Sequence, residues 1–138
     1  MSTILLVEDA PDLTLYEAGL LEAAGHRVLR CGGGPSPFGT CPMMQHSACV
    51  LADHADLILF SFRLFPPVTG RRYRGIDLLC AYRSHPRYGK LPMLVVSVGV
   101  PEVIEGTGPI EEVERWSGPR TILGAVERLL ATRWVPAQ

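Results

Sequence analysis

The sequence predicts an α/β protein in which helices cover both faces of a doubly wound, five-stranded parallel sheet. Strand-like and helix-like segments alternate along the whole chain, which is typical of repeated βα units. The runs at 3–7, 57–62 and 93–98 are short and nearly all apolar, as expected of strands that are buried on both faces. Right-handed crossovers between such strands place helices on both sides of the sheet.

The bulk composition is that of an ordinary globular protein. The chain has 138 residues, of which 47% are hydrophobic and 20% charged. This length predicts one domain spanning 1–138, with a core at about 3–131 and no output domain after it. The net charge of −1 argues against general nucleic-acid binding.

Targeting signals and membrane spans are not evident in the sequence. No apolar run approaches the roughly 20 residues that span a bilayer, and the N-terminus enters a strand without a signal segment. We therefore expect a cytoplasmic protein without membrane association. In that compartment its cysteines are expected to be thiols; they are Cys31, Cys41, Cys49 and Cys80.

The first half of the chain holds two predicted helices and two further strands. Pro11 suits the start of the first helix, and Gly25 suits its end. A strand is expected at 26–30 and a second helix at 42–52, before the strand at 57–62. The apolar face predicted for the first helix consists of Leu13, Tyr16, Leu20 and Ala24.

The second half predicts two clear helices and one doubtful one. Apolar residues at helical spacing mark a helix around 76–83 and a last helix around 122–130. A weak fifth strand fits at 113–116. The stretch 99–108 contains Pro101 and several glycines, so the fourth helix of the fold should be weakened or missing.

Polar side chains follow three of the predicted strands. Glu8 and Asp9 end the first strand, while Ser61 and Ser97 fall near the ends of the third and fourth. In doubly wound sheets the functional crevice lies beyond the carboxyl ends of the strands. We therefore expect these four residues at one edge of the sheet.

These strand-end motifs resemble the receiver domain of two-component response regulators over roughly residues 3–131. The segments 4–9, 56–61 and 91–97 match its first, third and fourth strands, which implies the flavodoxin-like topology of that family. The resemblance implies that Glu8 and Asp9 are the acidic pair that holds Mg²⁺ and that Ser97 is the switch hydroxyl. Ser61 then falls at the phosphoacceptor aspartate and Gly118 at the active-site lysine.

The two replacements remove the chemistry of phosphotransfer. An acyl phosphate needs a carboxylate nucleophile beside a divalent cation, and Ser61 is not a carboxylate. Glu8 and Asp9 alone predict at most weak Mg²⁺ binding; equally, they could simply cap the first helix. We therefore expect no catalytic residue, no required cofactor and no enzymatic activity.

Two surfaces are candidates for binding. Arg71, Arg72 and Arg74 lie beside the predicted pocket, where they could grip an anion or a partner; alternatively, they pair with nearby acids on a solvated loop. Arg115 or Trp116 falls near the aromatic switch position that the resemblance implies. Trp116 either belongs to an interface or fills the space left by a shortened fourth helix.

The resulting prediction is a stand-alone receiver-like domain, a pseudo-receiver, within two-component or phosphorelay signalling. It would act without phosphorylation, by binding a protein partner or a second copy of itself. The alternative is a receiver-like domain regulated by a small anionic ligand in the degenerate pocket. The sequence does not indicate an enzyme of another class, because it contains no activated nucleophile, glycine-rich phosphate loop or metal cluster.

Overall fold

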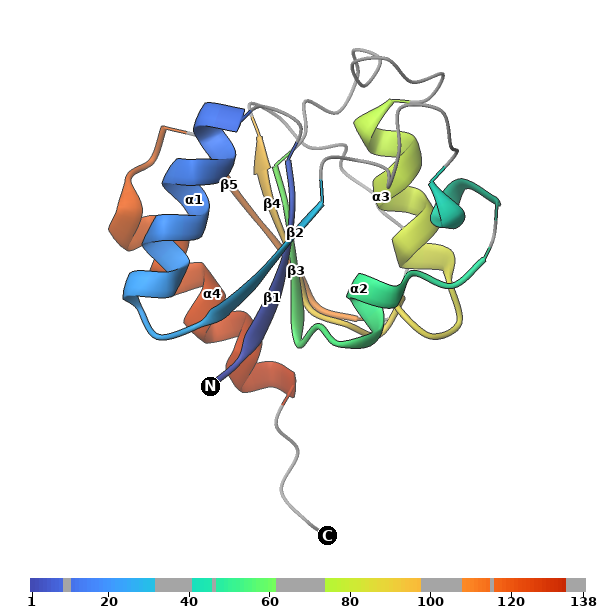
Figure 1. The fold of residues 1–138 in the computed structure, drawn as a ribbon. Coiled ribbons are helices and arrows are strands. Elements are labelled where there is room, and N and C mark those ends of the chain that lie inside the picture. Colours follow the sequence, from blue (N-terminus) through green and yellow to red (C-terminus); the bar gives the residue numbers. More distant parts are fainter. Residues whose placement is uncertain are drawn as a thin grey trace, which may run out of the picture.

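The computed structural model describes residues 1–8, 11–31, 41–45, 47–61, 74–97, 108–114 and 116–133. Five parallel strands form one sheet in the order β2-β1-β3-β4-β5 (Figure 1). This is the flavodoxin-like order, and the chain reverses its direction across the sheet between β1 and β3. The strands are β1 (Thr3–Val7), β2 (Arg27–Cys31), β3 (Leu57–Phe60), β4 (Met93–Ser97) and β5 (Ile110–Glu114).

Helices cover the two faces of this sheet, as predicted. The helices α1 (Pro11–Ala23) and α4 (Pro119–Arg133) lie on one face, and α2 (Val50–Asp53) and α3 (Gly75–Ser84) on the other (Figure 1). Each face has its own apolar core. Leu6, Leu59 and Val96 pack toward α1 and α4, whereas Val7, Phe60 and Val95 pack toward α3. The central strands are therefore buried on both sides, which explains their unbroken apolar sequences.

The fifth strand begins three residues earlier than the sequence indicates. It pairs with β4 along its whole length, from Met93 opposite Ile110 to Ser97 opposite Glu114. Three of its five residues are glutamates, and Val113 is its one buried residue. An edge strand with one buried residue shows little of the apolar pattern that predicts a strand from sequence. Its pairing with β4 defines β5, and its apolar content does not.

The first helix has the predicted limits but only part of the predicted buried face, because Leu20 packs against the core while Tyr16 and Ala24 are exposed. Gly25 ends it with a left-handed backbone at φ 93°, and the amide of His26 donates to the carbonyl of Leu21, as in a glycine-terminated helix. The buried residues are Glu17, Ala18 and Leu21, whereas Tyr16 is 49% exposed. Apolar residues surround α1, so packing against the sheet and α4, rather than spacing, selects its buried side.

The predicted helix at 42–52 is wrong as one element. The chain instead forms a 3₁₀ turn, η1 (Pro42–Gln45), and the separate short helix α2. Cys49 caps α2, because its backbone is extended and its Sγ accepts a bond from the Ala52 amide at 3.5 Å. The weakened fourth helix predicted at 99–108 falls on residues that, apart from Gly108, lie outside the described ranges. Within those ranges, no helix combines the length and apolarity needed to cross a membrane.

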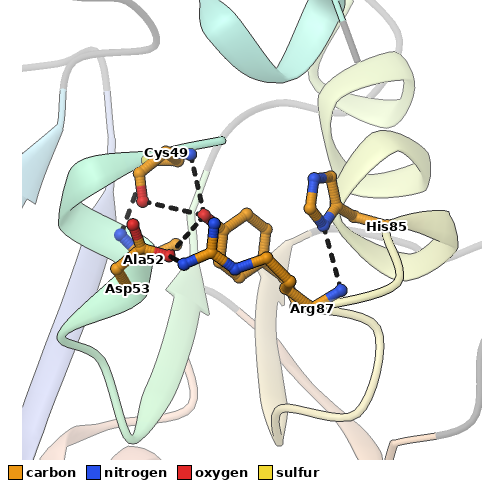
Figure 2. A network of polar contacts seen from close by, with 6 residues as sticks. Cys49, Ala52, Asp53, His85 and Arg87 are labelled. Carbon is orange, nitrogen blue, oxygen red and sulfur yellow. Dashed lines mark hydrogen bonds and ion pairs between the residues drawn. The ribbon is translucent and has the colours of Figure 1, made fainter. Parts of the chain in front are cut away.

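A polar network holds α2 against the turn between α3 and β4 (Figure 2). The Tyr88 hydroxyl accepts a bond from the Cys49 amide at 2.8 Å and donates to Asp53 Oδ1 at 2.7 Å, with the Cys49 carbonyl at 3.0 Å. Arg87 pairs with the same Asp53 carboxylate. The ring of His85 stacks on Tyr88, with their centroids 4.3 Å apart. One tyrosine therefore fixes the start of a helix almost 40 positions away in the sequence.

The Tyr88→Phe variant should lose about 1–3 kcal/mol of stability, because the buried Cys49 amide would keep no partner for its hydrogen. Burial and the bond to Asp53 raise the pKa of Tyr88. Its contribution is thus present below the unfolded tyrosine pKa of about 10 and is lost as pH rises through the higher folded value. Urea unfolding at several pH values between neutral and alkaline should show a shallower alkaline loss in the variant.

The exposed Tyr16 offers a matched control for that measurement. Tyr16→Phe removes the same hydroxyl from a residue that is 49% exposed. The free energy of unfolding should therefore change by no more than about 0.5 kcal/mol. Equal effects of the two substitutions would contradict the role assigned to the network.

Candidate functional site

The ends of β1 and β3 bring the first two predicted site residues together. Val7 lies opposite Phe60 in the parallel register, so Glu8 and Ser61 each come one position later on neighbouring strands. The Ser61 amide donates to the Val7 carbonyl at 2.9 Å, and the Glu8 amide donates to the Cys31 carbonyl, also at 2.9 Å. The sheet ladder therefore continues through both residues and fixes their backbones.

Both residues are buried at this edge. Glu8 is 3% exposed and Ser61 is 1% exposed. The site thus combines a carboxylate with a neutral hydroxyl in surroundings largely shielded from water. Such surroundings strengthen any charge interaction made there, but Ser61 brings no charge to it.

No described histidine is positioned to activate Ser61. His26, His54 and His85 each come just before the start of β2, β3 or the turn that leads into β4, so all three lie toward the opposite edge of the sheet from Ser61. His54, the nearest in sequence, is the C-terminal cap of α2. A serine hydroxyl needs an adjacent base to act as a nucleophile, and the described residues place no histidine there.

The remaining pocket positions are described only in part. Ser97 is the last residue of β4 and pairs with Glu114. The predicted switch position therefore lies at the carboxyl end of its strand, although the structure does not describe the Ser97 side chain. Asp9 lies outside the described residues, so Glu8 is the one described member of the predicted Mg²⁺ pair. Among the described residues, no three His, Cys, Asp or Glu side chains gather as a metal site.

Gly118 occupies a position that a lysine could not adopt without strain. Its backbone is left-handed, with φ at 98°, a region that side chains other than glycine and asparagine rarely enter. Its carbonyl accepts the bond from the Ile122 amide at 3.3 Å in the first turn of α4. The preceding turn is closed by Ser117, whose amide and hydroxyl both donate to the Glu114 carbonyl. The path of this loop therefore favours glycine at position 118 and disfavours a lysine.

Arg74 behaves as the solvated-loop alternative predicts. It comes directly before α3, and its guanidinium donates to Asp77 Oδ1 at 3.1 Å and Oδ2 at 3.3 Å. The hydrogen bond from Arg74 holds the pKa of Asp77 below its ordinary value. The Arg74 amide also donates to Asp77 Oδ2 at 2.9 Å, so the pair caps the helix. Arg71 and Arg72 lie outside the described residues.

Trp116 is 80% exposed, which contradicts the alternative that it fills space left inside the fold. It projects from the turn between β5 and α4; Arg115 beside it lies outside the described residues. The sequence did not indicate that Leu15 and Tyr16 are surface residues, yet they are 64% and 49% exposed on α1. Helical spacing assigned Tyr16 to the core, so only the actual packing shows these apolar groups at the surface.

Comparisons with known proteins identify the fold. Chemotaxis protein CheY4 of Vibrio cholerae is 17% identical, with a TM-score of 0.64 over 94% of this chain and 98% of the other. The receiver domain of a Syntrophus aciditrophicus histidine kinase is 15% identical, with a TM-score of 0.66 over 100% and 98%. A sensor histidine kinase receiver domain from Pseudomonas aeruginosa, solved with a magnesium ion in its active-site cleft, is 15% identical, with a TM-score of 0.65 over 94% and 98%.

No family model matches the sequence, and no curated protein matches it. At such low identity the structural likeness establishes the fold alone. The chain has the flavodoxin-like fold of CheY-like response regulator receiver domains. Its candidate site lies at the carboxyl ends of the neighbouring strands β1 and β3, where the order of the strands reverses.

Proposed function

We propose that this chain is a receiver-like signalling domain that works without being phosphorylated and acts by binding a protein partner. The observation that carries the proposal is the position of Ser61. It follows β3 directly, lies beside Glu8 and is almost fully buried. A receiver that used this position for phosphotransfer would need a carboxylate there.

The chemistry of the surrounding residues supports the same conclusion. Forming an acyl phosphate requires a carboxylate oxygen to attack phosphorus while a cation and a positive side chain neutralise the phosphoryl oxygens. Ser61 supplies no carboxylate, and Gly118 supplies no ammonium group. A divalent cation would also lose one of its oxygen ligands. Two of the groups needed for the reaction are thus replaced, while the fold around them is kept.

Exposed apolar side chains support binding as the remaining function. Leu15 and Tyr16 lie in the first half of α1, and Trp116 lies just before α4. Both helices begin at the edge of the sheet that holds Ser61, and both cover the same face (Figure 1). Aromatic and large apolar residues are enriched at the centres of protein interfaces. The alternative, an anionic ligand in the pocket, has less support because Arg74 is already paired with Asp77.

Intact-mass measurement after incubation with acetyl phosphate and Mg²⁺ tests the proposal. The native chain should gain no phosphoryl group, because Ser61 has no carboxylate to attack phosphorus and the described histidines lie toward the opposite edge of the sheet. Ser61→Asp restores the carboxylate, so this variant should gain one phosphoryl group if the rest of the pocket is competent. Ser61→Asn has nearly the shape of the aspartate variant without its nucleophile and should stay unmodified.

Phosphoryl mass on the native chain would refute phosphorylation-independent action and would show that another residue accepts the group. Modification of Ser61→Asp alone would show that the acceptor is the decisive loss. If neither form is modified, the proposal stands and Gly118 accounts for the further loss, since no ammonium group neutralises the phosphoryl oxygens.

A further inference from the structure

The two edge strands of the sheet carry opposite charges. Among the described strands, β2 pairs with β1 alone and β5 pairs with β4 alone. The strand β2 contains the exposed residues Arg27 and Arg30 and no acid. Three of the five residues of β5 are glutamates, and none is basic. One edge of the sheet is therefore basic and the other is acidic.

The side chains of both edges can be reached from solvent. On β2, Val28 and Leu29 pack against the two cores, yet each is only partly buried. On β5, Glu112 and Glu114 are exposed. The outer side of an edge strand also presents backbone N–H and C=O groups that its own sheet does not use. Within the part of the chain that the structure describes, each edge therefore has the groups that accept a further strand.

One basic and one acidic edge residue share a face of the sheet. Arg30 pairs with Glu22 on α1 at 3.3 Å, and Glu111 pairs with Arg128 on α4 at 2.9 Å. Because α1 and α4 cover the same face (Figure 1), Arg30 and Glu111 both belong to that face. Pairs that are at least partly exposed contribute little to stability, so both side chains remain able to contact an added strand.

The opposite face repeats this arrangement. Side chains alternate between the two faces along a strand, so Arg27 of β2 and both Glu112 and Glu114 of β5 belong to the face that α3 covers. All three residues are exposed, and none forms an ion pair with a described residue. If β5 of one copy lay beside β2 of another with their faces aligned, acids would meet bases on both faces.

Contact between two identical edges would bring like charges together. Two β2 strands would place arginines opposite arginines, and two β5 strands would place glutamates opposite glutamates. Like charges on directly opposed residues of neighbouring strands are destabilising, whereas opposite charges stabilise the pairing. The charge pattern therefore disfavours a symmetric dimer made from two identical edges and favours contact between unlike edges.

We propose that the basic edge β2 binds the acidic edge β5 of a second copy of this chain, so that the sheet continues from one copy into the next. A bound pair still presents one basic and one acidic edge, so the contact can add further copies in a row. The contact uses strand edges and not the exposed side chains of Leu15, Tyr16 and Trp116. It therefore goes beyond the proposed function, and neither proposal depends on the other.

Sedimentation velocity at increasing protein concentration tests the contact. The weight-average sedimentation coefficient of the native chain should rise with concentration without levelling off at a dimer. It should fall when salt is added at constant protein concentration, because salt screens exposed charges.

Two charge-reversed variants identify the edges. Arg27→Glu combined with Arg30→Glu makes both edges acidic, and Glu112→Lys combined with Glu114→Lys makes both edges basic. Each variant alone should stay monomeric. An equimolar mixture of the two should associate again, because the acidic β5 of the first variant then meets the basic β2 of the second.

A chain with all four substitutions is the control for net charge. It keeps the native net charge of −1 while its two edges exchange their signs, so it should associate with itself as the native chain does. Arg120→Glu reverses an exposed charge on α4, and Trp116→Ser removes an exposed aromatic ring. Both of these variants should associate like the native chain.

Three results would overturn the proposal. The first is a native chain that stays monomeric at every concentration, in which case the edge charges serve to prevent contact between edges. The second is a mixture of the charge-reversed variants that does not associate. The third is association that is lost in Trp116→Ser and kept in the edge variants, which would place the contact on the apolar surface.

Amide hydrogen exchange on the native chain tests the same contact without any variant. The amides of β2 and β5 should exchange more slowly at high than at low protein concentration, because an added strand protects them. Those of α1 should exchange at the same rate at both concentrations. Exchange in β2 and β5 that does not depend on concentration would overturn the contact even if the variants failed to fold.

Discussion

The Ser61→Asp variant should be less stable than the native chain by about 2–4 kcal/mol at neutral pH without divalent cations. The new carboxylate would occupy a position that is 1% exposed, beside Glu8 at 3%. Two buried like charges repel each other, and the desolvation of each adds to the cost.

The sign of the pH dependence follows from that repulsion. The folded pKa of the new carboxyl should lie above its unfolded value of about 4, because burial and Glu8 both disfavour its charged form. The stability deficit should therefore be small at pH 4 and grow as pH rises through the folded pKa. Added Mg²⁺ should reduce the deficit at neutral pH, since carboxylate oxygens are its preferred protein ligands.

Urea unfolding of Ser61→Asp at pH 4.5 and pH 7, with and without Mg²⁺, measures these effects. Ser61→Asn is the matched control, because it has a similar volume and no charge; its stability should depend little on either variable. An aspartate variant as stable as the asparagine variant at pH 7 would show that position 61 does not share its electrostatic environment with Glu8.

Gly108→Ala should destabilise the fold by about 3 kcal/mol or more, since overpacking against fixed atoms cannot be relieved by side-chain motion. A Cβ at this position would lie 2.6 Å from the carbonyl carbon of Lys90 and 2.7 Å from the Leu91 oxygen. The Gly108 amide also donates to the Gly89 carbonyl at 2.8 Å. The substitution would therefore push the approach to β5 away from the turn that leads into β4.

Gly19→Ala is the contrasting substitution in the same protein. Gly19 lies in α1, where an added Cβ would meet nothing within 4 Å. Alanine should therefore stabilise the helix by about 0.5–1 kcal/mol. Differential scanning calorimetry of both variants measures the difference, and similar Tm values would contradict the close backbone packing at Gly108.

The sequence predicted the strands best where burial was most uniform. Strands β1, β3 and β4 lie in the middle of the sheet and are covered on both sides, so their apolar runs were unambiguous. Their limits differ from the predictions by no more than two residues. β5 was displaced in the prediction because its pairing with β4, and not its composition, defines it.

Packing between distant segments explains the errors in the helices. The sequence between 42 and 52 contains helix-forming residues, but Tyr88 binds the Cys49 backbone and sets a new helix start there. In α1, the actual buried side includes Glu17 and excludes Tyr16. Local spacing contains no information on which side the sheet will cover when a helix is apolar on several sides.

The candidate site was predictable because its residues follow strands. Parallel strands deliver their carboxyl ends to one edge, so Glu8 and Ser61 had to lie close together once β1 and β3 were assigned as neighbours. The sequence could not predict that Arg83 is buried with two nitrogens that make no hydrogen bond with a described residue, because this depends on every group that surrounds the side chain. The same holds for the exposure of Trp116, because the sequence left open whether this side chain belongs to an interface or fills space inside the fold.

By itself, the sequence determined the alternation of strands and helices and the strand-end positions of Glu8, Ser61 and Ser97. Those features depend on neighbours in the chain and on the regular geometry of a parallel sheet. Only the tertiary structure decided which side of α1 is buried and where α2 begins. It also decided that Gly118 has a left-handed backbone and that Arg83 is buried. Each of these depends on contacts between residues far apart in the chain, whose energies no local pattern records.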